Sequence, residues 1–168
     1  MNGHEIAIEI AEESDLWHRL DGIEERVRRA VAASVAVANL KHAPGAELSV
    51  VLTDDAGIRT INAQWRGMDK PTNVLSFPQA EGKAIARAPM LGDIILACET
   101  IEREAAEAEK PFADHVTHLI VHGLLHLFGY DHMNDADAEA MEAMEIRILA
   151  TLDIENPYAD APLQREAS

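Results

Sequence analysis

The sequence predicts an α+β domain, and two observations about its apolar residues support this. Short apolar segments typical of strands occur about four times before residue 98, and helical patterns separate most of them. From residue 98 to about residue 152 the pattern is almost wholly helical. With 168 residues, of which 48% are hydrophobic, the chain is long enough to bury one substantial core. We therefore expect a small sheet of about four strands flanked by about five helices.

The strands are expected at residues 5–10, 48–52, 74–77 and 92–97. The first two show period-two alternation of apolar residues, and Pro78 ends the third because proline cannot donate to a sheet. Residues 79–90 are polar and alanine-rich, and we expect this segment to be mobile. Right-handed connections from the first strand to the second, and from the second to the third, would make part of the sheet parallel.

The helices are expected at about residues 15–39, 55–65, 98–109, 112–128 and 135–152. Asp15 is the expected cap of the first helix, which the segment from His42 to Gly45 ends with a proline and a glycine. Residues 1–155 are expected to form a single domain. Residues 156–168 are expected to form an extended or disordered tail.

The charge distribution is uneven along the chain. The net charge of −16 argues at first against a polyanionic partner, because phosphate binding usually requires a basic surface. Residues 59–90, however, carry a local balance of +3, which leaves −19 for the remainder. The five basic residues of this segment are Arg59, Arg66, Lys70, Lys83 and Arg87. This segment is therefore the place where an anion would dock.

The sequence shows neither a signal peptide nor an apolar segment of membrane-spanning length. We therefore expect a soluble, cytoplasmic protein with no membrane partner. The single cysteine, Cys98, excludes an internal disulfide and fits a reducing compartment. Because its neighbours Leu96 and Ala97 are apolar, we expect a small buried side chain rather than a functional thiol.

Three histidines at the end of the central expected helix form the most informative motif. The motif reads His122-Gly-Leu-Leu-His126-Leu-Phe-Gly129-Tyr-Asp-His132. Residues four apart project from the same helix face, and Gly129 can end the helix in the left-handed conformation, so that His132 returns toward the other two. Three neutral imidazoles leave a fourth position open on a tetrahedral zinc ion. The motif predicts one zinc ion per chain in a catalytic site, held by His122, His126 and His132.

The residue after the first histidine separates this motif from a known enzyme class. The spacing is that of the metzincin metallopeptidases, which have a glutamate general base where this chain has Gly123. Glycine inside a helix destabilises it by about 1 kcal/mol against alanine, so its presence indicates that something approaches the backbone closely. A metallopeptidase remains an alternative, but one without its catalytic base.

Two further residues near the motif have open roles. His118 lies one helical turn before His122, and we expect it either to face the substrate or to orient a metal ligand, with a hydrogen-bonded core histidine as the third possibility. Asp131 either orients a ligand imidazole or shapes the turn before His132.

Three separated motifs together resemble the YbeY family. They are Trp65-Arg-Gly-Met-Asp-Lys-Pro-Thr-Asn-Val-Leu-Ser-Phe-Pro78, then Leu91-Gly-Asp-Ile94, then the three-histidine motif. The resemblance runs roughly from the second expected strand to the final helix. It implies a small mixed sheet with the metal at one end of a cleft, and a zinc-dependent endoribonuclease that matures the 3′ end of small-subunit ribosomal RNA and acts in ribosome quality control.

The resemblance also implies roles for individual residues. It places the metal ligands on His122, His126 and His132 and the motif arginine on Arg66, where a guanidinium would bind the scissile phosphodiester. Lys70 and Thr72 would hold neighbouring phosphates, and a single-stranded substrate is expected because the acidic chain has little basic surface for a duplex. The nucleophile is either water activated by the metal or the RNA 2′-hydroxyl. A non-catalytic, ribosome-associated protein with structural zinc, which would need a fourth ligand such as Cys98, is the remaining alternative.

Overall fold

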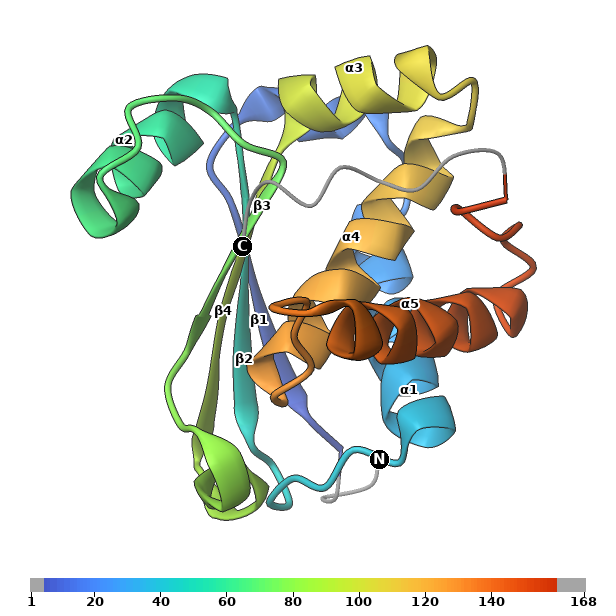
Figure 1. Cartoon of the computed structure of the whole chain (residues 1–168). Helices are drawn as coiled ribbons and strands as arrows, with labels where there is room; N and C mark the ends of the chain where they lie inside the picture. The colour runs from blue at the N-terminus through green and yellow to red at the C-terminus, as the bar shows by residue number, and fades with distance from the viewer. Residues whose placement is uncertain (1–4, 160–168) are drawn as a thin grey trace.

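Four strands form one mixed sheet with helices on both of its faces (Figure 1). The structure, a computed structural model, describes residues 5–159. The strands are β1 (Ala7–Glu12), β2 (Glu47–Thr53), β3 (Val74–Pro78) and β4 (Met90–Ala97). The α-helices are α1 (Ile23–Ala38), α2 (Asp55–Arg66), α3 (Cys98–Glu107), α4 (Phe112–Leu127) and α5 (Asp135–Ala150), and the 3-10 helices are η1 (Asp15–Arg19) and η2 (Gly82–Arg87). The α+β prediction is confirmed.

The strand order is β1-β2-β4-β3. β1 pairs with β2 and β2 with β4 in parallel, so the first predicted connection, through α1, is confirmed. The second was wrong, because β3 lies at the edge and runs antiparallel to β4. The physical reason is visible in Figure 1, where the loop after α2 carries the chain back to the end of the sheet that β2 has just left. β3 then starts from that end and runs in the opposite direction.

The predicted helix over residues 15–39 is in fact two helices. Ser14, not Asp15, caps η1, by accepting a hydrogen bond from the Leu16 N–H. Gly22 then takes a left-handed φ of 70°, which breaks the helical path before α1 begins. The break lets the fully buried Trp17 lie against the sheet, where its indole N–H donates to the Thr53 carbonyl at 2.8 Å.

Helix α4 is the centre of the main core. It packs on β3 and β4, while α1 and α5 pack on α4 (Figure 1). The sequence predicted a close approach to the backbone at Gly123, and the sheet makes it. A Cβ at this position would lie 3.0 Å from Ser76 Oγ and 3.1 Å from Ile94 Cγ2. A smaller cluster on the opposite sheet face joins Ile58 of α2 to Leu75 of β3, so α2 and α4 lie on opposite faces of β3.

Two segments expected to lack regular structure are partly structured. The segment over 79–90 contains η2, whose Ile85 is buried in the main core. Met90, the last residue of the segment, is the first residue of β4. In the expected tail, Tyr158 packs against His118 with ring centroids 5.5 Å apart, while residues 160–168 lie outside the described part. None of the helices between residues 5 and 159 has the length and apolar character needed to cross a membrane.

Candidate active site

Helix α4 and the turn after it bring the three motif histidines together. His122 and His126 are one turn apart near the end of α4, and Gly129 ends the helical path with a φ of 100°, as its place in the motif predicted. His132 then faces both, with ring centroids 6.0 Å from His122 and 6.2 Å from His126. Asp131 shapes the turn, because its carboxylate accepts the backbone N–H of His132 at 2.7 Å.

A buried carboxylate behind the histidines fixes the orientation of His122. Glu145 of α5 is fully buried and accepts hydrogen bonds from His122 Nδ1 at 2.8 Å and His118 Nε2 at 2.7 Å. The Tyr158 hydroxyl donates to the same carboxylate. Burial by itself would raise the pKa of Glu145, but the hydrogen bonds from His118 and His122 outweigh it and hold the pKa well below its usual range. Glu145 is therefore an ionised acceptor in the folded protein.

The ionised carboxylate decides which ring nitrogens carry protons. A carboxylate only accepts, so Nδ1 of His122 and Nε2 of His118 must donate. In neutral His122 the lone pair is then on Nε2, the nitrogen that a metal ion would use. Burial, and then the neighbouring His122, lower the pKa of His126, which favours the neutral ring that metal ligation requires.

The histidine cluster has the chemistry of a metal site, and its rings lie slightly farther apart than the ligands of a bound zinc ion would. Within residues 5–159 no set of three His, Cys, Asp or Glu side chains is arranged to hold a metal. Around a tetrahedral zinc with nitrogens at about 2.1 Å, ring centroids would lie about 5 Å apart, roughly 1 Å closer than the rings of this cluster. Among residues 5–159, the buried Nδ1 of His126 has no hydrogen-bond partner, so this polar ring is incompletely paired. Neutral imidazoles with a carboxylate behind one of them are a typical zinc donor set.

Cys98 lies too far away to act as a fourth ligand. Leu127, next to His126, packs on Gly92 near the start of β4. Cys98 follows the other end of β4, about 20 Å away along an extended strand. It is fully buried, its thiol donates to the Leu16 carbonyl, and burial raises its pKa to about 12. The expectation of a buried thiol is confirmed, and in this fold Cys98 does not complete a closed four-ligand site with the histidines.

The loop after α2, residues 67–73, is held firmly in place. Gly67 ends α2 with a φ of 69°, and the buried Asn62 donates from Nδ2 to the Lys70 carbonyl at 2.9 Å. Arg59 makes two hydrogen bonds with Asp69, at 2.8 and 3.3 Å. At the end of the loop, Asn73 donates to Glu104 of α3 at 3.0 Å. Hydrogen bonds therefore fix this loop at three points.

The predicted substrate-binding residues differ in how much surface they present. Arg66 and Lys70 are exposed, and neither pairs with a carboxylate of the described residues. Thr72 is only 9% exposed, and His118 is 1% exposed and bonded to Glu145. A ring this deeply buried does not reach a substrate, so of the roles considered for His118 the geometry favours orientation of a ligand, through the shared carboxylate. His115 likewise donates to a carboxylate, that of Glu104, at 2.8 Å.

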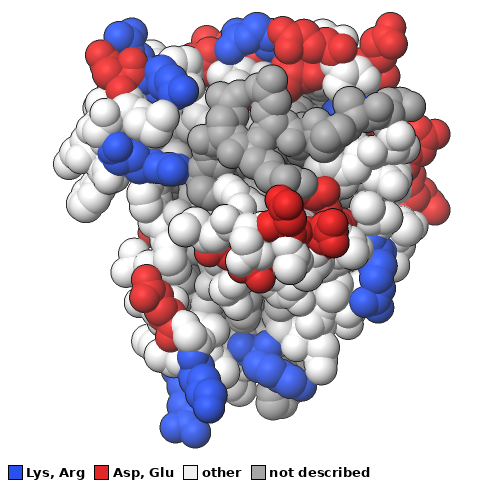
Figure 2. Space-filling model, in the orientation of Figure 1, with Lys and Arg blue, Asp and Glu red and all other residues white. Residues whose placement is uncertain are grey.

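Arg66 and the histidines lie on either side of the edge strand. Arg66 ends α2, on the face of β3 that carries Leu75 and Phe77, whereas Ser76 on the other face contacts Gly123 of α4. The edge strand β3 therefore separates the two groups in the folded chain. Figure 2 shows basic side chains around α2 and η2 and acidic ones over the start of α5. The predicted basic segment is therefore divided: Arg59 and Arg66 belong to α2, whereas Lys83 and Arg87 belong to η2, whose Ile85 packs in the main core.

Glu145 and Tyr158 are the site residues that the sequence did not reveal. Glu145 carried one usable signal, since it stands between the buried Met141 and Ile148 on the core face of α5, where an acidic residue requires partners. Tyr158 carried none, because its contact with α4 depends on the path of the chain after α5.

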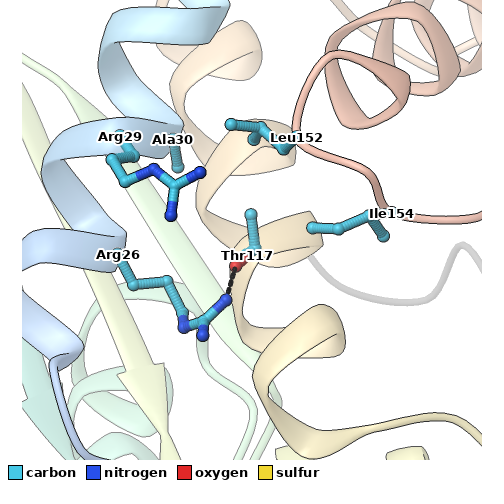
Figure 3. Close-up of a pocket in the computed structure, with 6 residues that line it drawn as sticks. All are labelled: Arg26, Arg29, Ala30, Thr117, Leu152 and Ile154. Atoms are coloured by element: carbon cyan, nitrogen blue, oxygen red, sulfur yellow. Dashed lines mark hydrogen bonds between the residues drawn. The ribbon is translucent and has the colours of Figure 1, made fainter.

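A small pocket lies elsewhere, between α1, α4 and the segment after α5 (Figure 3). Its volume of about 30 Å³ has room for about two water molecules. It is lined by Arg26, Arg29, Ala30, Thr117, Leu152 and Ile154. Arg26 donates to the Thr117 hydroxyl at 3.4 Å across it. None of the motif histidines lines this pocket, and it is not part of the candidate site.

Comparison with known proteins gives one consistent family. A family model described as "Endoribonuclease YbeY" matches residues 9–153. A protein of that name from Bradyrhizobium diazoefficiens is 57% identical over 153 residues, covering 89% of this chain and 83% of its own. One from Rhizobium meliloti is 53% identical, covering 92% of this chain and 96% of its own. A solution structure from Thermotoga maritima, 23% identical, covers 96% of this chain and all of its own with a TM-score of 0.52, which supports the fold.

Proposed function

The chain belongs to the endoribonuclease YbeY family, and from this premise we propose that it is a metal-dependent endoribonuclease that cleaves single-stranded RNA. Its substrate is ribosomal RNA, at the 3′ end of the small-subunit species, and its place of action is the cytoplasm. These last two statements rest on the family resemblance. The proposed role is maturation of that end and quality control of the ribosome.

The observation that carries the proposal is the convergence of His122, His126 and His132 in front of the buried Glu145. We assign one zinc ion to the three rings, because three neutral imidazoles with a carboxylate behind them are a typical catalytic zinc donor set. When bound there, zinc supplies a Lewis acid for the phosphate and lowers the pKa of water. Glu145 keeps His122 in the tautomer whose Nε2 faces the cluster.

Arg66 has the second role in the proposal. An exposed guanidinium without a carboxylate partner can bind a phosphodiester through two parallel hydrogen bonds and stabilise the charge that grows on its oxygens. Lys70, which is exposed in the loop after α2, adds a second cation for an adjacent phosphate. Because β3 lies between Arg66 and the histidines, the RNA strand crosses the edge of the sheet to reach both. A flexible single strand can follow this path more easily than a rigid duplex.

A metallopeptidase is the weaker alternative. The metzincin base position is Gly123, which packs on the sheet and has no side chain to take a proton. Glu145 does not replace it, because this carboxylate is fully buried behind His122 and already accepts three hydrogen bonds. Neither Gly123 nor Glu145 therefore supplies a base for peptide hydrolysis.

Cleavage assays test the proposal. Wild type should cut a labelled single-stranded RNA with the 3′-end sequence of small-subunit ribosomal RNA, and should leave the same RNA in a duplex and casein largely intact. Arg66→Ala should lower the cleavage rate by about 100-fold. Arg28→Ala, which removes an exposed arginine from α1, is the matched control and should cut normally. The ends of the product identify the nucleophile, since a 2′,3′-cyclic phosphate requires the 2′-hydroxyl. Digestion of casein without cleavage of RNA would instead make the protein a peptidase.

A further inference from the structure

Trp65 presents a large aromatic side chain to solvent near the end of α2. It is 68% exposed, whereas the other tryptophan, Trp17, is fully buried. Among the large hydrophobic residues of the described chain, only Met133 is comparably exposed. The fold itself does not bury most of the Trp65 surface, although the ring contacts that of Phe77. An exposed tryptophan of this kind is typical of a binding surface.

The exposed ring contacts Phe77, and the loop beside it is held by hydrogen bonds. Phe77 of β3 lies under it, with ring centroids 6.4 Å apart and the planes tilted by 57°. Phe77 itself is partly buried against the small core cluster of α2 and β4. The hydrogen bonds from Arg59 to Asp69 and from Asn62 to the Lys70 carbonyl hold the adjoining loop. Trp65 is therefore a preorganised surface, which loses little conformational freedom when a planar group binds to it.

The charges around the ring select the kind of partner. Arg66 and Lys70 are exposed and pair with no carboxylate in residues 5–159, although the chain as a whole carries a net charge of −16. Basic side chains lie around α2 in Figure 2. An aromatic face next to unpaired cations is the combination that binds single-stranded nucleic acid, in which bases stack on the ring and phosphates contact the cations.

We propose that Trp65, supported by Phe77, is a stacking subsite for one unpaired base of the RNA, with Arg66 and Lys70 on the phosphates beside that base. This inference rests on the proposed function, and it adds a reason for strand selectivity. In a duplex the faces of the bases are covered by their neighbours, so only a single strand offers a base to the ring. The subsite accepts any base, because every base has an aromatic face.

The two tryptophans make the subsite directly measurable. Trp17 is inaccessible, so quenching of tryptophan fluorescence by a bound base reports on Trp65. A single-stranded oligoadenylate should quench the emission of the wild-type protein. An abasic oligonucleotide of equal length, which keeps the phosphates and lacks the bases, should bind more weakly and quench little. The same RNA in a duplex should also quench little.

Three substitutions separate stacking from simple apolar contact. In fluorescence anisotropy with labelled single-stranded RNA, Trp65→Ala and Trp65→Leu should each weaken binding by about tenfold, while Trp65→Phe should keep most of the affinity. Gln64→Ala, at the neighbouring exposed position of α2, is the matched control and should bind as wild type does. Cleavage by Trp65→Ala should show a raised KM with little change in kcat, because the ring contacts a base and not the reacting phosphate.

The outcomes distinguish this inference from the proposed function. Wild-type protein that cleaves single-stranded RNA, together with Trp65→Leu that binds it equally well, would overturn the stacking subsite and leave the ribonuclease assignment intact. If RNA binding is unchanged and Trp65→Ala instead loses binding to another protein, the ring is a protein-binding residue. Quenching by the abasic strand as strong as by oligoadenylate would also contradict stacking. Wild-type protein that neither binds nor cuts RNA would instead refute the proposed function.

Discussion

Replacement of Glu145 by glutamine tests whether the buried carboxylate controls the histidine cluster. The substitution keeps the side-chain volume, so no cavity forms, and it removes the charge that three hydrogen bonds depend on. An amide has one accepting oxygen, so its NH₂ group must face either His122 or the pair formed by His118 and Tyr158. Facing His122, it forces the other tautomer and moves the proton to Nε2, the nitrogen assigned to the metal. Facing the pair, it leaves two donors without an acceptor in a fully buried place.

The expected size of the effect follows from these contacts. Either all three charge-assisted hydrogen bonds become neutral or two donors lose their acceptor, so Glu145→Gln should lower the free energy of unfolding of the metal-free protein by about 3 kcal/mol. The affinity for zinc should fall by about 10- to 100-fold, as for other residues that orient metal ligands. Urea denaturation in the presence of a chelator measures the first quantity, and competition with a chromophoric chelator measures the second.

The control for Glu145→Gln is Glu139→Gln, which removes the same charge from an exposed position of α5. Glu139→Gln should change the free energy of unfolding by less than about 0.5 kcal/mol and leave zinc affinity unchanged. If Glu145→Gln matched Glu139→Gln in both measurements, the carboxylate would not control the histidines, and the role assigned to it here would be refuted.

Three further outcomes are expected. Burial by itself would raise the pKa of Glu104, but hydrogen bonds from His115 and Asn73 outweigh burial and lower this pKa. The ionised Glu104 therefore stabilises the folded protein above about pH 4.5, and this stabilisation is lost as the pH falls through the folded-state pKa. The stability difference between wild type and Glu104→Gln should shrink on acidification, and a constant difference would contradict this. Because burial raises the pKa of Cys98 to about 12, iodoacetamide at pH 8 should modify it only in unfolded protein, and modification of the native protein at the rate of a free thiol would contradict its burial. Gly129→Ala, at a φ of 100°, should lower the free energy of unfolding by at least about 1 kcal/mol and weaken zinc binding through His132. Gly22→Ala, at a φ of 70°, should lower the free energy of unfolding similarly and leave zinc binding unchanged.

The local parts of the site were predictable from the sequence, and the long-range parts were not. The spacing of His122 and His126 on one helix and the helix end at Gly129 depend on residues close together in the chain, and the structure has both features. The hydrogen bonds that Glu145 accepts from His118 and His122 join α5 to α4, and sequence spacing carries no information about which helix faces which. The clue was an acidic residue on an apolar helix face, which identifies a buried charge without identifying its partner.

Two errors in the fold have similar physical origins. The antiparallel direction of β3 depends on where the loop after α2 ends, and handedness rules for parallel connections do not apply to it. The break between η1 and α1 did carry a local signal, since Asp21-Gly22 is a typical turn pair and Gly22 has a left-handed φ of 70°. The apolar periodicity that continues across it concealed the break. Periodicity reports which residues are buried, and both pieces bury residues in the same core.

Metal content measured together with RNA cleavage on the same samples tests the central claim most directly. The claim is that His122, His126 and His132 hold one metal ion that RNA cleavage requires. Elemental analysis of purified wild type should find about one zinc per chain, and His126→Ala should lose both the zinc and the cleavage of single-stranded RNA. Chelation should abolish cleavage by wild type, and zinc should restore it. Full zinc content in His126→Ala, or RNA cleavage by metal-free wild type at the normal rate, would contradict the claim.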